Sequence, residues 1–478
     1  MTTPDLAPMP PADDGFAALG LSPALSQVVA ELGFARPTPV QARAIPLLLA
    51  GRDLIGQSTT GSGKTAAFAL AILQKVRLGE RHPQALILCP TRELCAQVAR
   101  ELRKLGRREA GLQVLILSGG QPMNPQLAAL QRGVHVVVGT PGRALDHIVR
   151  SSLNLNGVAT LVVDEADRML DLGFGEEMEK ILSSAPKSRQ TVFFSATYPR
   201  SIDAMIRAHQ RDPERLTIDE SEGPPALLRQ LAYVVNDGGR QDTLLAILRA
   251  SPPESAIVFC NFKATVARVQ QALDTAGVSS AALHGDLDQR KRDFVMAKLR
   301  NHSIRVLVAT DVAARGLDIE GLDLVVNLEL PFQPEIYVHR IGRTGRAGKA
   351  GVAVSLVGPQ DGAKLRAIEA AIGSPLERQV APPPPQGDGF DPGTAVPADA
   401  AMATLYLSGG RKDKVRPGDI LGALTGEAGG FQGSEVGKIE IHDRFSYVAI
   451  AKGSAARAIE RLGAGRIKGK KFKVGLAT

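Results

Sequence analysis

A chain of 478 residues is too long for one ordinary hydrophobic core, so we expect two or three domains. Apolar residues make up 44% of the chain and charged residues 22%, which is typical of a globular protein and excludes a disordered one. The net charge of +8 favours an anionic partner.

Membrane and secretory signals are missing from the sequence pattern. No run of about twenty apolar residues is present, which argues against a membrane-spanning helix. Residues 1–14 are polar and Pro-rich, without the basic start and apolar segment of a secretory signal. The three cysteines, Cys89, Cys95 and Cys260, lack the spacing of a metal site, and we expect free thiols in a reducing, cytoplasmic protein.

Short apolar, β-branched runs alternate with helix-like segments through the first two thirds of the chain. The strands expected in the first half are Leu54–Ile55, Ala85–Leu88, Val114–Leu117, Val134–Val138, Leu161–Val163 and Thr191–Phe194. After Pro213 the pattern restarts, with strands expected at Ala256–Phe259, Ile304–Val308, Leu324–Leu328 and Val352–Val357. Strands separated by helical crossovers predict parallel, doubly wound sheets, so we expect two α/β domains in tandem.

Breaks in this pattern give the expected domain limits. The chain is predicted to consist of a flexible N-terminus (1–14), a first α/β domain (15–212), a linker (213–225), a second α/β domain (226–378), a Pro/Gly-rich linker (379–402) and a small basic domain (403–478).

The sequence Asp-Glu-Ala-Asp at residues 164–167 follows an apolar run that we expect to be a buried strand. Two acids at the carboxyl end of a parallel strand can hold Mg²⁺ and aim a water molecule at a nucleotide γ-phosphate. Four acidic or small residues are also typical of a solvated loop, so the motif alone leaves both interpretations open.

A second motif, Gly61-Ser-Gly-Lys-Thr65, lies between a short strand and a helix-like run, Ala66–Val76. This is the context of a phosphate-binding loop, whose backbone N–H groups approach the phosphates at a helix N-terminus. Lys64 would neutralise phosphate charge and the Thr65 hydroxyl would help to hold Mg²⁺. Ser58 replaces the first glycine of the general pattern, which leaves a plain Gly-rich turn as the alternative. With the acidic strand end, however, the loop favours a nucleoside-triphosphatase.

Further short motifs follow in a fixed order. In the first half they are Phe34-Ala-Arg-Pro-Thr-Pro-Val-Gln41, Thr60–Thr65, Pro90-Thr-Arg-Glu-Leu94, Gly119-Gly120, Thr140-Pro-Gly-Arg143, Asp164–Asp167 and Ser195-Ala-Thr197. In the second half they are Phe259-Cys-Asn261, Gln289-Arg-Lys-Arg292, Ala309–Asp318 and His339-Arg-Ile-Gly-Arg-Thr-Gly-Arg346. From about Phe16 to Gly358 the chain thus resembles the DEAD-box family of ATP-dependent RNA helicases. Cys95 after Leu94 is a mild departure from the family's pattern.

The resemblance implies two tandem RecA-like domains that use ATP and Mg²⁺. The residues it places on ATP are Phe16, Gln41, Thr60, Gly61, Ser62, Gly63, Lys64, Thr65, Gly316 and Asp318. The residues it makes catalytic are Lys64, Asp164, Glu165, Arg343 and Arg346. Thr65 and Asp164 would hold Mg²⁺ largely through water, Glu165 would orient or deprotonate the attacking water, and the arginines would stabilise charge on the phosphoryl group. For Phe16, an ordinary core contact is an equal alternative to packing near the base.

The resemblance also implies RNA contacts, mostly to phosphate and sugar, which position a strand without reading its sequence. The residues it places on RNA in the two halves are Thr91, Arg92, Gly120, Thr140, Gly142 and Thr310, with Gly316 beside them. The residues it makes the link between the ATP site and the interdomain cleft are Asp167, Ser195, Thr197 and His339. Ordinary turn chemistry is the alternative for the small and hydroxyl residues on the RNA.

The last residues carry most of the positive charge. From Thr404 to Thr478 there are fourteen Lys and Arg against seven Asp and Glu, a net +7 of the +8 of the whole chain. The expected elements are strands at Leu405–Leu407, Val436–Ile441, Tyr447–Ile450 and Lys471–Val474, with helices at Asp419–Leu424 and Ser454–Leu462. This β-α-β-β-α-β order predicts an RRM-like α+β domain. Tyr406 and Phe445–Val448 occupy the places of the RNA-stacking motifs, but match their consensus poorly.

Several segments of this tail, among them Arg416-Pro-Gly-Asp-Ile-Leu-Gly-Ala-Leu-Thr-Gly426 and Ile467-Lys-Gly-Lys470, resemble the C-terminal RNA-binding domain of the DbpA subfamily of bacterial DEAD-box proteins. The resemblance implies recognition of a 23S ribosomal RNA hairpin and a role in late assembly of the large subunit. The basic residues expected on RNA are Arg411, Lys412, Arg416, Lys468, Lys470 and Lys471.

We therefore predict an RNA-stimulated ATPase that unwinds short RNA duplexes locally. We expect a cytoplasmic monomer that has 23S ribosomal RNA as its partner and neither a membrane nor a protein partner. The alternatives are a general RNA chaperone or ATP-dependent RNA clamp without ribosomal specificity, and a DNA helicase.

Overall fold

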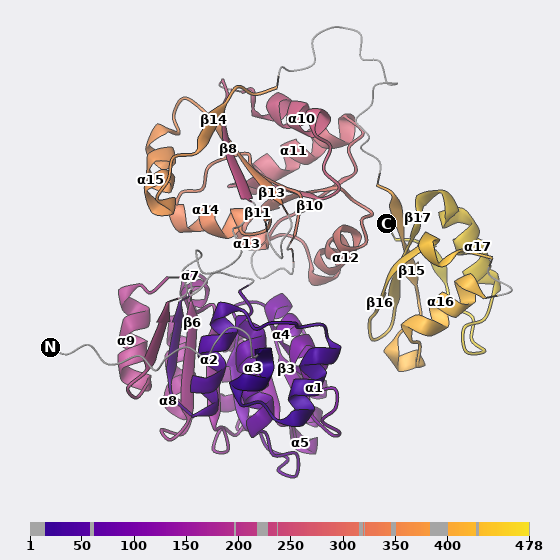
Figure 1. The fold of residues 1–478 in the computed structure, drawn as a ribbon. Helices are drawn as coiled ribbons and strands as arrows, with labels where there is room; N and C mark the ends of the chain where they lie inside the picture. The colour runs from indigo at the N-terminus through magenta and orange to yellow at the C-terminus, as the bar shows by residue number, and fades with distance from the viewer. Residues whose placement is uncertain are drawn as a thin grey trace, which may run out of the picture. The chain divides into compact units, whose positions relative to one another are not determined.

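The computed structural model describes residues 15–57, 62–195, 197–217, 228–236, 238–314, 319, 321–345, 350–382, 400–426 and 430–477 (Figure 1). The chain divides into two compact units near Pro225. The first unit contains one α/β domain, and the second contains another α/β domain and the small C-terminal domain. Among the residues described, we find no helix with both the length and the apolar character needed to cross a bilayer.

The first unit is built on a parallel sheet of seven strands in the order β3-β4-β2-β5-β6-β1-β7. Its strands are β1 (Leu54–Gln57), β2 (Ala85–Leu88), β3 (Val114–Leu117), β4 (Val136–Gly139), β5 (Thr160–Asp164), β6 (Gln190–Ser195) and β7 (Glu214–Thr217). Its helices are η1 (Gly15–Leu19), α1 (Pro23–Glu31), α2 (Pro39–Leu49), α3 (Lys64–Lys75), α4 (Arg92–Leu105), α5 (Met123–Arg132), α6 (Pro141–Val149), α7 (Ala166–Asp171), α8 (Gly175–Ser184) and α9 (Arg200–His209).

Two hydrophobic layers cover this sheet because successive residues of a strand face opposite sides. Val162 of β5 and Phe194 of β6 point into the layer formed with α1–α4. Their neighbours along the same strands, Val163 and Phe193, point into the layer formed with α6–α9. Both faces are therefore buried, which explains why β2, β4 and β5 read as continuous apolar runs.

The second unit contains a similar parallel sheet in the order β10-β11-β9-β12-β13-β8-β14. Its strands are β8 (Leu228–Val234), β9 (Ala256–Cys260), β10 (Ser280–Leu283), β11 (Val306–Thr310), β12 (Leu324–Asn327), β13 (Gly351–Val357) and β14 (Glu377–Gln379). Its helices are α10 (Arg240–Ala250), α11 (Lys263–Thr275), α12 (Gln289–Arg300), α13 (Asp311–Ala314), α14 (Pro334–Ile341) and α15 (Gly362–Ile372). Helices α10 and α11 pack on one face, and α14 and α15 lie on the other (Figure 1).

The tail is an α+β domain with an antiparallel sheet in the order β16-β17-β15-β18. Its elements are β15 (Met402–Leu407), η4 (Arg411–Asp413), α16 (Pro417–Thr425), η5 (Gly433–Glu435), β16 (Val436–Ile441), β17 (Ser446–Ala451), η6 (Lys452–Ser454), α17 (Ala455–Ala464) and β18 (Val474–Leu476). One face of this sheet packs on α16 and α17. The predicted fold class, with two tandem doubly wound domains followed by an RRM-like domain, is confirmed.

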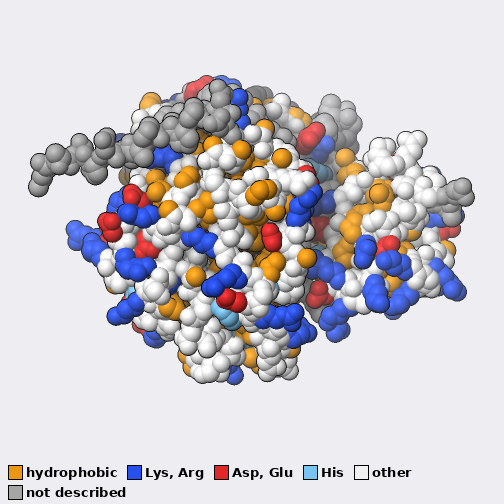
Figure 2. Space-filling view, turned by 60° about the horizontal axis from the view of Figure 1, so that its bottom comes forward, with side chains coloured by type: hydrophobic (Ala, Val, Ile, Leu, Met, Phe, Trp, Pro, Cys, Tyr) orange, Lys and Arg blue, Asp and Glu red, His pale blue; other side chains and the backbone are white. Residues whose placement is uncertain are grey.

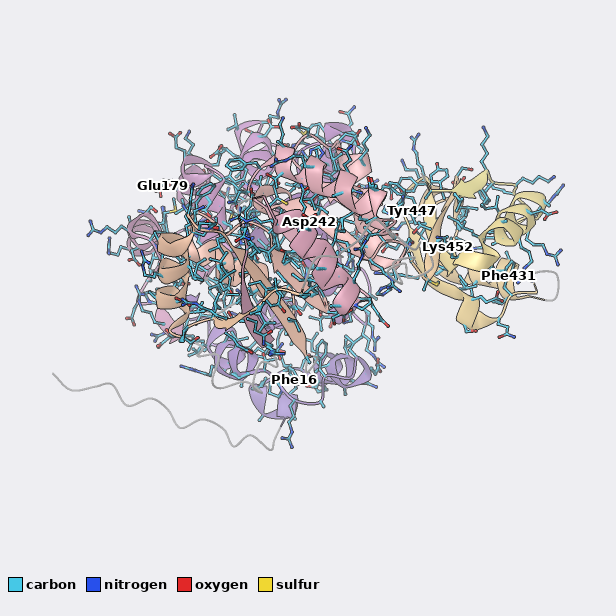
Figure 3. The ribbon with its side chains drawn as sticks, turned by 90° about the horizontal axis from the view of Figure 1, so that it is seen from above. Phe16, Glu179, Asp242, Phe431, Tyr447 and Lys452 are labelled. Atoms are coloured by element: carbon cyan, nitrogen blue, oxygen red, sulfur yellow. The ribbon has the colours of Figure 1, made fainter. Side chains whose placement is uncertain are left out.

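The other face of the tail sheet contacts α12 of the second α/β domain. Arg300 of α12 forms two hydrogen bonds with the Glu440 carboxylate, at 2.7 and 2.8 Å. The Phe294 ring lies 5.8 Å from that of Tyr447, which Figure 3 labels on the sheet, away from Phe431 on the helix side. Asn301, just after α12, donates a hydrogen bond to the Thr404 hydroxyl at 3.3 Å.

Four strands were absent from the predicted elements. They are β7, β8, β10 and β14. Strand β7 lies inside the expected linker 213–225, and β14 runs across the expected boundary between residues 378 and 379. The last strand, expected at Lys471–Val474, instead begins at Val474 and ends at Leu476. Strands β7 and β14 are short, polar strands at the edges of their sheets, where one side has no strand partner and little apolar surface is buried.

Arg340 is the largest fully buried side chain, at 1% exposure, although it carries a charge. Its guanidinium makes a bidentate pair with Asp311, at 2.6 and 2.7 Å. It also donates to the Asn261 side chain at 2.8 Å and to the backbone carbonyl of Glu329 at 2.7 Å. These contacts join the ends of β9, β11 and β12 to α14, so this arginine holds together the carboxyl edge of the second sheet.

We predict that Arg340→Ala destabilises the second α/β domain by about 3–5 kcal/mol, because it removes a buried guanidinium and leaves the partly buried Asp311 carboxylate without its partner. Arg340→Lys should restore only part of the lost free energy of unfolding, since an ammonium group cannot form the planar bidentate pair with Asp311. Native-state hydrogen exchange at the amides of β11 and β12 measures the effect in a chain of several domains.

The matched control is Arg229→Ala, which removes an exposed pair with Glu377 in the same domain. It should leave the exchange of β11 and β12 unchanged. Equal protection in the Arg340 variant and in this control would contradict the proposed structural role.

Candidate active site and RNA-binding surfaces

The phosphate-loop segment ends at the N-terminus of α3, as the sequence predicts. Gly63 is the N-cap with a φ of 95°, in the left-handed region that favours glycine. A Cβ atom there would lie 2.5 Å from the Nε2 atom of Gln41, so a larger residue does not fit. Lys64 is the first residue of α3 and is buried. The predicted residues Thr60 and Gly61 lie outside the described residues.

Gln41 connects the start of α2 to this loop. Its side-chain oxygen accepts the Thr38 N–H at 2.9 Å, and its side-chain nitrogen donates to the Gly63 carbonyl at 3.2 Å. The Thr38 hydroxyl in turn donates to the Ser62 carbonyl at 2.7 Å. An amide retains a second lone pair and a second N–H after these bonds, so contact with a base edge stays chemically open.

Phe16 lies in the hydrophobic core of the first domain. Its ring centroid is 6.2 Å from that of Phe34, and 7% of the residue is exposed. The core contact of Phe16 is thus present, and its position near the base of a nucleotide stays a prediction.

The acidic motif is at the carboxyl end of β5, with both of its first two side chains buried. Asp164 is the last residue of the strand and Glu165 is the N-cap of α7. Glu165 has a φ of 55° and a ψ of 54°, a left-handed conformation that costs a residue with a side chain about 1–3 kcal/mol. Such strain at a strand end is typical of a functional site.

Oδ1 of Asp164 and Oε2 of Glu165 accept no hydrogen bond from the described residues, although Oε2 of Glu165 lies 3.4 Å from Nε of Arg168 in an ion pair. Burial raises the pKa of Asp164 to about 7, with Glu165 and Asp167 adding to the rise and Lys64 opposing it. Oxygens of this kind fit a hard cation and its water shell, which supply the missing partners. The described residues contain no cluster of three or more His, Cys, Asp or Glu that could hold a metal ion by themselves.

Asp167 connects the acidic motif to the end of β6. Its carboxylate accepts the backbone N–H and the hydroxyl of Thr197, at 3.0 and 3.1 Å. Its own N–H donates to the Ser195 hydroxyl at 3.1 Å, and that hydroxyl donates to the Thr197 carbonyl at 2.7 Å. The three residues predicted to form a hydrogen-bonded link in this domain are thus directly bonded to one another.

The RNA candidates of the first domain follow three neighbouring strands. Thr91 follows β2 and caps α4, accepting the Leu94 N–H at 3.2 Å. Gly120 follows β3 with a φ of 68°, and a Cβ atom there would collide with the Arg92 guanidinium. Thr140, the N-cap of α6, follows β4, and Gly142 lies in the first turn of that helix. The structure brings all five candidates, Thr91, Arg92, Gly120, Thr140 and Gly142, to one edge of the sheet.

The second domain supplies fewer described candidates. Thr310 is the last residue of β11, and His339 lies in α14. Arg343 follows α14, where its carbonyl accepts the Leu322 N–H at 3.1 Å. The predicted residues Gly316, Asp318 and Arg346 lie outside the described residues. The sequence analysis missed Arg340, although it stands inside the motif that contains His339 and Arg343.

The tail candidates gather on one surface formed by two segments distant in the sequence. The Lys468 ammonium donates to the Lys414 carbonyl at 2.9 Å and pairs with Asp419 at 3.0 Å. Lys470 pairs with Asp413 at 3.5 Å. We define the basic tail surface as Arg411, Lys412, Arg416, Lys468, Lys470 and Lys471, all of them exposed. Blue Lys and Arg side chains are visible on this domain, at the right of Figure 2.

Comparison with family models divides the chain in the same way. Residues 38–205 match the DEAD/DEAH box helicase model, and residues 239–348 match the helicase conserved C-terminal domain. Residues 404–476 match the DbpA RNA binding domain.

Two curated relatives and one solved structure cover most of the chain. The ATP-dependent RNA helicase DbpA of Escherichia coli K12 is 46% identical over 456 residues, 95% of this chain and 98% of the relative. The DEAD-box ATP-dependent RNA helicase CshA of Bacillus cereus is 45% identical over 367 residues, 77% of this chain and 70% of the relative. The structure of S. cerevisiae Dbp5 bound to RNA and ADP BeF3 superposes with a TM-score of 0.70 at 33% identity, covering 80% of this chain and 97% of that one. The chain therefore belongs to the DEAD-box ATP-dependent RNA helicases, with a C-terminal domain of the DbpA type.

Proposed function

We propose that the chain hydrolyses ATP at the β1, β5 and β6 ends of the first sheet and uses the cycle to unwind short RNA duplexes locally. In this proposal Lys64 and Thr65 hold the phosphates and Mg²⁺, and Asp164 holds the ion largely through water. When bound, Mg²⁺ would neutralise the negative charge that develops on the phosphates during hydrolysis. Glu165 orients or deprotonates the attacking water, and Arg343 and Arg346 stabilise the transferring phosphoryl group.

The observation that carries this proposal is the order of the strands. The phosphate loop, the acidic motif and the Ser195–Thr197 segment follow β1, β5 and β6, which are neighbours in the sheet. The RNA candidates follow β2, β3 and β4, three strands that also lie side by side in the sheet. One carboxyl edge is thus shared by two adjacent groups of residues, and Asp167 lies at the start of α7 between them.

We predict that Glu165→Gln keeps ATP and RNA binding but lowers RNA-stimulated turnover by about 10²–10⁴-fold, the usual contribution of a general base. Single-turnover ATP hydrolysis, with separate titrations of a fluorescent nucleotide and of RNA, measures both effects.

The control is Glu176→Gln, on the exposed surface of α8 in the same domain. It should leave hydrolysis unchanged. Turnover in the Glu165 variant equal to that of the control would contradict the assigned role.

For the tail we propose RNA binding through the basic tail surface, directed to a hairpin of 23S ribosomal RNA in large-subunit precursors. The excess of +7 on this one domain supports an RNA contact. The face of the tail sheet that does not pack on α16 and α17 contacts Phe294 and Arg300 of α12. This contact supports a position for RNA elsewhere on the domain. The rival is a general RNA chaperone, or an ATP-dependent RNA clamp, without ribosomal specificity.

Deleting residues 404–478 should preserve unstimulated ATPase activity and abolish preferential stimulation by ribosomal RNA that contains the hairpin. Lys468→Ala with Lys470→Ala should reduce that preference and lower the salt dependence of RNA binding by roughly 1.5 in log–log slope, because two phosphate contacts are lost. ATPase assays with ribosomal and random RNA of equal length measure the first effect, and binding at several salt concentrations measures the second.

The charge-matched control is Lys452→Ala with Arg461→Ala, elsewhere on the same domain. A slope reduced equally by both double variants would assign the effect to net charge rather than to this surface. Equal stimulation of the intact chain by ribosomal and random RNA would favour the rival.

A further inference from the structure

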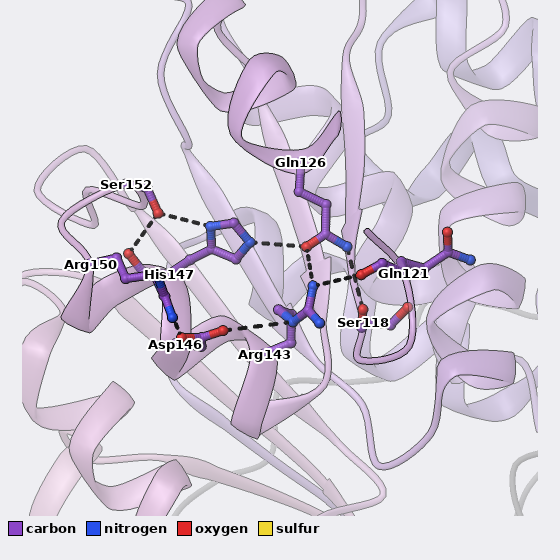
Figure 4. Close-up of polar contacts among 8 residues, drawn as sticks. All are labelled: Ser118, Gln121, Gln126, Arg143, Asp146, His147, Arg150 and Ser152. Atoms are coloured by element: carbon purple, nitrogen blue, oxygen red, sulfur yellow. Dashed lines mark hydrogen bonds and ion pairs between the residues drawn. The ribbon is translucent and has the colours of Figure 1, made fainter. Parts of the chain in front are cut away.

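A buried polar network lies directly beneath the RNA candidates of the first domain. It joins the loop after β3 to α5 and α6 (Figure 4). Ser118, Gln126 and His147 are 3%, 5% and 0% exposed. Buried polar groups are costly unless each one is bonded, so this network needs a reason.

Gln126 is the centre of the network. Its side-chain oxygen accepts a hydrogen bond from the Arg143 guanidinium at 2.9 Å, and lies 3.0 Å from Nε2 of His147. Its side-chain nitrogen donates to the Ser118 carbonyl at 3.4 Å. Arg143 can only donate and a carbonyl can only accept, so these two partners fix which end of the amide points where.

The orientation of Gln126 also fixes one ring nitrogen of His147, because the Nε2 atom faces an oxygen and must carry a hydrogen. The Nδ1 atom lies 2.8 Å from the Ser152 hydroxyl, and that hydroxyl donates its one hydrogen to the His147 carbonyl at 3.0 Å. Burial lowers the pKa of His147, as does the nearby Arg143, and to a smaller extent Arg150, while Asp146 opposes the change. Each ring nitrogen of this buried imidazole therefore has a polar neighbour.

The same network holds the loop after β3 at two points. Gln126 bonds the carbonyl of Ser118, and Arg143 bonds that of Gln121 at 3.1 Å. Gly119 and Gly120 lie between these points. Arg143 belongs to the first turns of α6, immediately after Thr140 and Gly142. The two backbone segments that carry RNA candidates are therefore connected through the Gln126 amide and the Arg143 guanidinium, and the His147 imidazole bonds the same Gln126 oxygen from α6.

We propose that Gln126 and His147 are positioning residues for RNA binding, which set the spacing between the loop after β3 and the start of α6. The proposal rests on the proposed contact of RNA with Gly120, Thr140 and Gly142. Successive phosphates along a strand are at fixed separations, so two backbone segments bind them together only if their own spacing is held. Neither residue touches RNA in this proposal.

A pair of His147 variants tests it in the full-length chain. Glutamine can place a side-chain N–H near the Nε2 position and keep the bond to Gln126. Asparagine is similar in chemistry but reaches only the Nδ1 position, beside Ser152. We expect His147→Asn to raise the KM for RNA about tenfold, the effect of one lost hydrogen bond, while kcat at saturating RNA stays within about twofold. His147→Gln should remain within about twofold of the parent in both constants.

Melting temperatures of all variants are measured in parallel. Equal KM values for the asparagine and glutamine variants would overturn the proposal, because a purely structural role does not distinguish the two nitrogens. If either variant fails to fold, the same assay is applied to Gln126→Met. This substitution removes the side-chain hydrogen bonds at the centre of the network while nearly preserving side-chain volume. In that case an unchanged KM for RNA overturns the proposal, and a rise of about tenfold supports it.

The exposed control Gln113→Met should leave the KM for RNA unchanged. Failure of the underlying function gives a different result, because the parent chain itself would then show no RNA stimulation. If RNA stimulates the ATPase of the parent chain and these substitutions leave the KM for RNA unchanged, only the positioning role is rejected.

Discussion

The first domain depends on two carboxylates held out of water at the end of one strand. Asp164 and Glu165 are buried, Oδ1 of Asp164 accepts no hydrogen bond from a described residue, and Oε2 of Glu165 lies 3.4 Å from the Arg168 guanidinium. Burial raises the pKa of Asp164, and the positive charge of Lys64 opposes the rise. In the proposed function a divalent ion and its water would reduce the cost of burying the Asp164 carboxylate. The left-handed backbone of Glu165 adds a second local cost at the same place.

The parallel sheet places this site beside the other candidate residues of the domain. All carboxyl ends of its strands meet along one edge, so residues far apart in sequence become neighbours there. Asp167 is bonded to the Ser195–Thr197 segment on one side of β5. On the other side, Gln126 and His147 connect the segments after β3 and β4. Short polar bonds between rigid strand ends can carry a displacement that flexible loops would absorb.

The motifs allowed the central strands and their functional ends to be predicted, because buried parallel strands are apolar runs and their loops carry the chemistry. Two of the edge strands could not be predicted in this way. Glu214–Thr217 and Glu377–Gln379 are short and polar, and only pairing with a neighbour makes them strands. Arg340 and Gln126 were missed for a related reason, since both are polar residues whose burial depends on partners 8 to 79 residues away. Gly316, Asp318 and Arg346 lie outside the described residues and stay predictions.

The tail illustrates how packing can change the use of a familiar fold. Tyr447 alternates with Val448 along β17, so it faces away from the domain's own core. In this chain that face meets Phe294 and Arg300 of α12, and burial raises the pKa of Tyr447 to about 12. The same face carries the rings of Tyr406 and Phe445, whose centroids lie 6.4 and 5.2 Å from that of Tyr447, so it keeps aromatic residues while it packs on α12. In the proposed function phosphate is instead bound by the basic tail surface, where residues 411–416 and 467–471 meet.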